Sequence, residues 1–423
     1  MRVSQEKSRE AVGGLTLAAG LLTGLTVVPG LLFRAGMDFM AAYMSMGAMT
    51  ILASGWLALR GLPLIAMPSV PLAAWLSYVV IISKGCSWQE IMGLSAAVSL
   101  VGFVLFSFTA GRKALEYVPD CIRSFLAIGL GLMLIMQGMV QGRLILASPW
   151  SALMMGNFQD PLAYWSLLGT ILGAVLLAGR FVWALGAAFL LTALFTCMEG
   201  FWVLPPAPGL LPEGMEKVLG QAMLLGSWSE NHLAEYFLLG AVLWLTVCSE
   251  SFCLWQVSCQ GERSPGSMLK GLAGFSFVGA FLGCLPLSLS PLSSVGWTAG
   301  GRKGRTTCIA LGALMILWLL EPLLAELASF PAMTVPLLLL SGVVMIKRQL
   351  AKFSPGELAL EDFLPGLAGA MLMAMSFNIA AGLGVMLLGR VLLLSAAGRR
   401  SELKAAEWVL ALLFLLYFMV GYL

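Results

Sequence analysis

Apolar runs follow one another along almost the whole chain, most of them near the roughly 20 residues that a helix needs to cross a bilayer. They predict an all-α integral membrane protein with fourteen spans, the last two of which share one long run that breaks near Ser376. The predicted runs are residues 13–33, 39–59, 62–82, 88–109, 122–141, 163–177, 181–202, 233–254, 268–285, 286–299, 306–324, 332–346 and 363–394. A last apolar segment, 407–423, either spans the membrane or lies at its surface.

Two of these runs differ from the others because prolines and serines interrupt them. Residues 62–82 include Pro63, Pro68 and Pro71, and residues 286–299 are rich in serine. Non-helical backbone at membrane depth is tolerated only where protein or a water-filled cavity satisfies it. Two such stretches in corresponding places point to the binding site of a transporter. The facing ends of their half-helices would form a polar pocket from backbone groups.

The same order of spans recurs in the two halves of the chain, with the broken span third in each. Because seven is an odd number, the second half enters the membrane from the opposite side, and we expect a 7+7 inverted repeat. The predicted parts are a first repeat at 1–202, an external connection at 203–231, a second repeat at 232–397, and a cytoplasmic link with the apolar C-terminal segment at 398–423.

Composition and charge agree with a membrane protein. The 423 residues are 60% hydrophobic and 11% charged, against roughly 25% charged in soluble domains. Basic residues concentrate in alternate loops, which predicts that the N-terminus and these loops are cytoplasmic. We expect a multi-pass protein of the cell (inner) membrane that does not bind nucleic acid. The loops concerned contain Arg60, Arg112, Lys113, Arg180, Arg302, Lys303, Arg305, Lys347, Arg348, Arg399 and Arg400.

Glu250 is the main candidate for chemistry, because it lies inside the eighth predicted span. A carboxyl group there costs about 2.5–3.5 kcal/mol on insertion scales, so such residues usually face a cavity and have a function. We expect Glu250 to bind substrate or carry a coupling proton; the alternative is a structural carboxyl bonded to a neighbouring helix end. Serines 69, 288, 290, 293 and 294 in the broken stretches could bind substrate or cap the half-helices.

Motifs of ATP hydrolysis, phosphoryl transfer or a nucleophilic serine are absent from the sequence. We therefore expect no enzyme activity, no catalytic residues and no cofactor, and the single histidine argues against a metal site. Transport would draw on an ion gradient, with H⁺ the simplest coupling ion and Na⁺ possible.

Several short motifs resemble the nucleobase–cation symporter family of xanthine/uracil permeases, in its hypoxanthine–adenine–guanine branch. The resemblance implies a core domain, a gate domain, fourteen helices, a homodimer and elevator-like alternating access. The motifs are Ala35-Gly-Met-Asp-Phe, Leu62-Pro63 with Pro68, Ser87-Trp-Gln-Glu90, Gly111-Arg-Lys, Val118-Pro119 with Ala127-Ile-Gly-Leu-Gly131, Ala299-Gly-Gly-Arg302-Lys-Gly304 and Trp408–Tyr417.

The resemblance also implies a set of site residues. Its acidic position on the eighth span is Glu250, but a second acid that contacts the base in the family is replaced by Leu292. Two family asparagines correspond to Val28 and Ala73. The expected substrate-binding residues are Glu250, Ser251, Ser69, Ala73, Leu292, Ser293 and Ser294.

Proton-coupled symport of a nucleobase or similar planar heterocycle is the first functional hypothesis. A site that leaves N–H groups of a purine unpaired loses about 1–3 kcal/mol for each, and Leu292 and Ala73 offer no such partners. The alternative is therefore a carrier or channel of the same fold for a small organic or inorganic anion. A third hypothesis is a sensor or assembly partner that does not transport.

Overall fold

A computed structural model describes residues 2–108, 118–151, 153–202, 205, 214–223, 233–258, 265–353 and 359–421. Most of the predicted connection 203–231 and the motif at 111–113 lie outside these residues. The elements of the first half are α1 (Arg2–Arg34), α2 (Phe39–Leu59), β1 (Ala66–Met67), α3 (Val70–Ala74), η1 (Trp75–Ser83), α4 (Trp88–Leu105), α6 (Asp120–Gln141), β2 (Ile145–Ala147), β3 (Leu153–Met155), α7 (Pro161–Ala178), α8 (Ala184–Met198) and η3 (Met215–Lys217). The second half contains α9 (Leu233–Ser258), α10 (Pro265–Phe281), β4 (Ser288–Leu289), α11 (Ser293–Thr298), α12 (Gly304–Trp318), α13 (Glu321–Ser329), η5 (Pro331–Met333), α14 (Val335–Leu350), α15 (Leu360–Ser376), α16 (Ile379–Ala396), η6 (Arg400–Glu402) and α17 (Ala405–Gly421).

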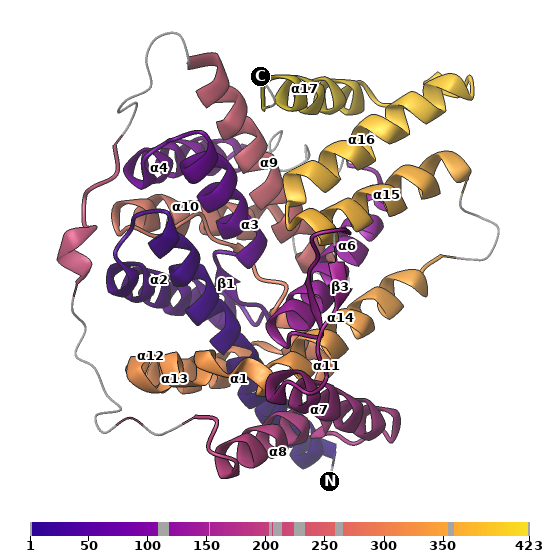
Figure 1. Ribbon diagram of the computed structural model, residues 1–423. Helices are drawn as coiled ribbons and strands as arrows, with labels where there is room; N and C mark the ends of the chain where they lie inside the picture. The colour runs from indigo at the N-terminus through magenta and orange to yellow at the C-terminus, as the bar shows by residue number, and fades with distance from the viewer. Residues whose placement is uncertain are drawn as a thin grey trace.

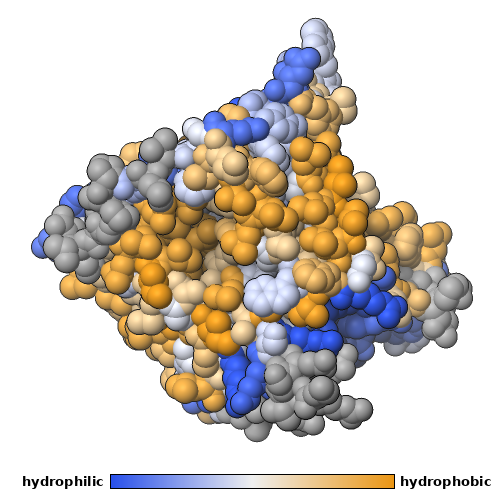
Figure 2. Space-filling model, turned by 90° about the horizontal axis from the view of Figure 1, so that it is seen from below, coloured by the Kyte–Doolittle hydropathy of each residue, from blue (hydrophilic) through white to orange (hydrophobic). Residues whose placement is uncertain are grey.

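The protein is a largely helical membrane protein. Within the described residues, eight helices are long and apolar enough to cross a membrane, or nine if the bent pair α12–α13 is one span. Further apolar helices, including Val70–Ser83, Ala184–Met198 and Ala405–Val420, are shorter. Figure 2 shows apolar side chains over most of one face, with hydrophilic residues gathered toward its edges. Such extensive apolar surface suits a lipid environment rather than water.

Capping residues set several of the helix ends. The Asp38 carboxylate accepts from the Ala41 N–H at 3.1 Å and caps the start of α2. Asn378 caps α16 in the same way. Between α15 and α16, Phe377 has a φ of 51°, a left-handed conformation that ends a helix. This is the break that the sequence predicted near Ser376.

One predicted span is shorter than expected. The apolar run 306–324 becomes two helices, because α12 ends at Trp318 and the chain turns by 94° into α13. Pro322 lies in the first turn of α13, where proline is tolerated but could not have continued α12. Hydropathy alone could not reveal this bend, since both helices are apolar.

Two groups of helices lie on either side of β1. Figure 1 shows α2, α4, α10 and α12 on one side and α6, α14, α15 and α16 on the other, while α1 and α9 run between them. Helices α6 and α14 cross closely: a Cβ added at Gly342 would come within 2.6 Å of the Gly131 carbonyl oxygen. Glycine at this crossing lets the two backbones approach. The short strands thus lie where the two groups meet.

Candidate functional site

The two broken stretches meet in a two-stranded antiparallel ladder. Strand β1 pairs with β4, with Ala66 opposite Leu289 and Met67 opposite Ser288. Each strand is followed directly by a short helix, α3 after β1 and α11 after β4. The N-terminal ends of these half-helices therefore lie beside one small ladder, as the pattern of prolines and serines predicted. Free N–H groups at helix N-termini favour polar or anionic ligands.

Serine side chains satisfy much of the unwound backbone. The Ile65 N–H donates to Ser293 Oγ at 3.0 Å, and the Leu289 N–H donates to Ser251 Oγ at 3.1 Å. Both serines are fully buried. Because a buried N–H without a partner is costly, these contacts stabilise the ladder. Ser251 and Ser293 are thus engaged in the framework of the site.

Glu250 projects from α9 toward the ladder and is completely buried. Ser69 Oγ, at the start of α3, donates to Glu250 Oε2 at 3.0 Å. Ser288 Oγ lies near the same carboxyl, but neither Ser288 Oγ nor Glu250 Oε1 has a partner with hydrogen-bond geometry. In the described part of the chain, the groups around this carboxyl are hydroxyls rather than cations. One carboxyl oxygen is therefore buried without a hydrogen-bond partner.

A small central cavity lies between the two half-helices and α6. Its volume is about 10 Å³, close to the minimum for one water molecule, so the site is closed to a larger ligand in this conformation. Leu292 lines it, together with Ser290 from the same segment and Gln137 from α6. Glu250 lies behind Ser69, whose neighbours Pro68 and Val70 line this cavity.

The other predicted site residues are close by but do not line this cavity. Ala73 is fully buried in α3, and Ser294 Oγ in α11 is buried without a hydrogen-bond partner. Val28 of α1, which corresponds to a family asparagine by the resemblance, is also fully buried. The structure thus brings Leu292, Ser69 and Glu250 around the meeting point of the half-helices. It places the remaining residues in the packing around them.

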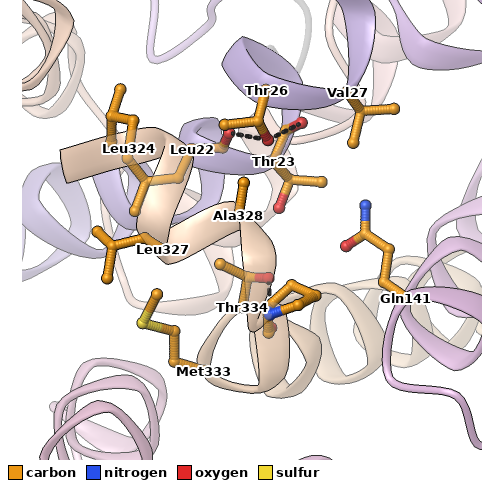
Figure 3. A pocket seen from close by; sticks show the side chains of 11 residues that line it. Leu22, Thr23, Thr26, Val27, Gln141, Leu324, Leu327, Ala328, Met333 and Thr334 are labelled. Carbon is orange, nitrogen blue, oxygen red and sulfur yellow. Dashed lines mark hydrogen bonds between the residues drawn. The ribbon is translucent and has the colours of Figure 1, made fainter. Parts of the chain in front are cut away.

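Two larger cavities lie next to one another beyond the central one. The wide cavity, about 870 Å³, shares Val70 and Gln137 with the central cavity and extends to Asn378 at the turn between α15 and α16. The outer cavity, about 250 Å³, shares Val27 and Gln141 with the wide cavity. Figure 3 shows the outer cavity between α1, α13 and the end of α6. The three cavities are therefore neighbours that share lining residues, from the ladder outward.

Two residues of this series, Gln137 and Gln141, were missed from the sequence. They are four positions apart in the apolar helix α6, so they occupy the same face. A pair of amides in an otherwise apolar span was the available signal. Neutral amides are less conspicuous than charged residues in a hydropathy pattern.

Comparison with known proteins relates the chain to transporters. No protein-family model matches the sequence. The guanine/hypoxanthine permease PbuO of Bacillus subtilis is 25% identical over 424 residues, covering 96% of each chain. The adenine permease AdeP of Escherichia coli K12 is also 25% identical, over 96% of this chain and 92% of its own. The transmembrane domain of the cyanobacterial bicarbonate transporter BicA shares the fold, with a TM-score of 0.57 and 16% identity over 89% of this chain and 97% of that domain.

The matches to the permeases run nearly from end to end, with no large part of either chain left over. They confirm the resemblance that the short motifs indicated, at an identity low enough to allow changes within the site. The chain is a divergent relative of guanine/hypoxanthine and adenine permeases, which are membrane transporters and not enzymes.

Proposed function

We propose that this protein is a secondary transporter that carries a nucleobase, or a similar planar heterocycle, together with a proton. The observation that carries the proposal is the buried Glu250–Ser69 pair beside the paired half-helices, in a chain related over 96% of its length to guanine/hypoxanthine and adenine permeases. A carboxyl oxygen without a partner can accept an N–H of a base, or it can take up a proton.

The proposed mechanism is alternating access. The helices α2, α4, α10 and α12, with the half-helices, would form a core domain, and α6, α14, α15 and α16 a gate domain. Movement of the core against the gate would open the small central cavity first to one side and then to the other. Glu250 would exchange its proton when water enters, and Na⁺ bound by unwound carbonyls is the other coupling ion that such a site could use.

The proposal includes the finer architecture. We propose fourteen spans in two inverted repeats, at 1–202 and 232–397, joined by the external connection 203–231 and followed by 398–423. The N-terminus would be cytoplasmic, the location the inner membrane, and the assembly a homodimer. The contact of β1 with β4, at corresponding places in the two halves, supports the repeat.

Transport of a small anion is the second candidate. Leu292 lines the central cavity at a position where the family resemblance implies an acid, so the half-helix N-termini have one fewer negative charge beside them to repel an anion. A bicarbonate transporter is among the proteins of this fold. In this case the half-helix ends would bind the anion, and Glu250 would be protonated during transport.

Uptake by proteoliposomes distinguishes these candidates. Purified protein is tested with labelled hypoxanthine, guanine, adenine, uracil, bicarbonate and sulfate, with and without an inward pH gradient. Nucleobase uptake that the gradient increases supports the proposal. Anion flux without nucleobase uptake would favour the second candidate, and no flux of any kind would indicate a protein that does not transport.

The role of Glu250 needs a variant with a matched control. Glu250→Gln retains the size of the side chain but cannot carry the proton, so gradient-driven accumulation should disappear. Glu326→Gln serves as the control, because Glu326 is an exposed acid on α13. Unchanged pH-driven nucleobase uptake in Glu250→Gln would remove this residue from the mechanism.

A further inference from the structure

Helix α6 contributes a polar group to the central cavity from the side opposite the half-helices. Gln137 lines both the central and the wide cavity. Its side chain is only 7% exposed, and its Nε2 atom has no hydrogen-bond partner. Buried side-chain amides in proteins normally have partners. An amide donor directed into a cavity is a group that a ligand could satisfy.

Gln141 extends the same polar face toward the outer cavity. It lies one turn beyond Gln137, a rise of about 6 Å along the helix, and it lines the wide and outer cavities. Its Oε1 atom is buried without a partner, as is Thr23 Oγ1 of α1. Figure 3 shows Gln141 and Thr23 on walls of the outer cavity that come from different helices. Each of the three cavities therefore has at least one of these glutamines on its wall.

Gln137 differs from other buried amides that lack a partner because it lies on the walls of two cavities. Gln349 on α14 is also buried and also has an Nε2 atom without a partner, but it is not among the residues lining these three cavities. Replacing a buried amide that lacks a partner by an apolar side chain of similar shape can be neutral or stabilising. Stability of the folded chain therefore does not account for an amide at the centre of the site.

We propose that Gln137 contacts the transported molecule, and that its amide donates a hydrogen bond to an acceptor atom of that molecule when the central cavity opens. Gln141, which lines the outer and wide cavities, would contact the molecule before it reaches Gln137. A ring nitrogen or carbonyl oxygen of a planar heterocycle provides such an acceptor. The inference rests on the proposed function and adds a substrate contact from the α6 side, so that the ligand is held between the half-helices and α6.

The test compares Gln137→Met with the matched control Gln349→Met. Methionine retains the length of the side chain and removes the donor. Initial rates of nucleobase uptake should show about a tenfold rise in KM for Gln137→Met, which corresponds to about 1.4 kcal/mol. The maximal rate should change less than twofold, and the thermal stability in detergent should not fall. Gln349→Met should leave KM unchanged.

Three results would overturn the inference: an unchanged KM in Gln137→Met, an equal rise in both variants, or a rise in KM accompanied by lower thermal stability. The wild-type protein separates this failure from that of the proposed function. If the wild type takes up a nucleobase and Gln137→Met has the same KM, only the inference fails. If the wild type carries only an anion, the proposed substrate is wrong, and the KM for that anion tests the Gln137 donor. If the wild type carries nothing, both fail.

Discussion

Ser69 Oγ donates to Glu250 Oε2 over 3.0 Å, which ties the start of the half-helix α3 to the middle of α9. The two residues are 181 positions apart in the sequence and come from opposite halves of the chain. Ser69 occupies the N-cap position of α3, yet its hydroxyl does not cap that helix. It donates to the carboxyl instead, so this contact links the start of α3, in the first broken span, to the protonation state of Glu250.

Removing the Ser69 hydroxyl should impair transport. Ser69→Ala leaves Glu250 without its hydrogen-bond donor, and the loss of about 1.4 kcal/mol corresponds to a roughly tenfold lower uptake rate. Initial uptake in proteoliposomes measures the effect. Ser77→Ala is the matched control, since Ser77 lies in the following helix, is fully buried and has a hydroxyl without a partner. Equal rates in the two variants would contradict a special role for Ser69.

Ser293 and Ser294 are adjacent and both buried, but their substitution should have different effects. Ser293→Ala leaves the Ile65 N–H without its acceptor and should lower the free energy of unfolding by about 1–3 kcal/mol. Ser294→Ala removes a hydroxyl that has no partner and should leave stability nearly unchanged. If Ser294 binds substrate as predicted, the KM for nucleobase uptake should rise in Ser294→Ala. Thermal unfolding and uptake kinetics, measured on both variants, decide these expectations.

Glu10 should stabilise the loop that follows α11. Its carboxylate accepts from the backbone N–H groups of Arg302 at 3.1 Å and Lys303 at 3.2 Å, and from the Thr306 hydroxyl. Because Glu10 is only 4% exposed, Glu10→Gln should reduce stability by about 1–3 kcal/mol.

Glu6→Gln is the control for this prediction. Glu6 pairs with Lys303, but both side chains are more than half exposed, and exposed ion pairs contribute little. Thermal unfolding of Glu6→Gln should therefore resemble that of the wild type. If Glu6→Gln lost as much stability as Glu10→Gln, the hydrogen bonds from the Arg302 and Lys303 N–H groups to Glu10 would not be what stabilises the loop.

Acid should weaken the contact between α2 and η3. The ammonium group of Lys217 donates to Asp38 Oδ2 at 2.7 Å, and this hydrogen bond, followed by the Ala41 N–H, lowers the pKa of Asp38. The resulting stability is present above about pH 3.9, the ordinary pKa of Asp, and is lost as the pH falls through the lowered value.

Thermal unfolding of the wild type and of Lys217→Met between pH 6 and pH 3 measures this effect. Lys217→Met should be slightly less stable at pH 6, with a difference that disappears as Asp38 is protonated. The difference should be small, because the Asp38 and Lys217 side chains are 35% and 63% exposed. A difference that grows toward low pH would have the wrong sign.

Much of the architecture could be predicted because its signals are local. Asp38 precedes an apolar run and caps it, and the break at Ser376 follows from a short polar interruption. The apolar runs at 39–59 and 122–141 correspond closely to α2 and α6. The bend after Trp318 was missed because residues 306–324 are apolar overall, and the only local signals were Glu321 and Pro322 at the start of α13.

The candidate site was located from the sequence but could not be assembled from it. Proline and serine identified the two broken stretches, and the cost of burying a carboxyl identified Glu250. The uses of the serines depend on contacts across more than 30 positions: Ser251 and Ser293 bind backbone N–H groups, whereas Ser69 binds Glu250. No local pattern separates these roles.

The sequence by itself determined that the chain lies in a membrane, where its helices begin and end in most cases, and which two stretches cannot be helical throughout. These properties follow from hydropathy and from the backbone limits of proline, which act over a few residues. Only the tertiary structure decided that β1 pairs with β4, that Leu292 rather than Glu250 lines the central cavity, and that Gln137 faces it from α6. Those relationships depend on which helices pack together, because burial and hydrogen bonding are set by neighbours distant in the chain.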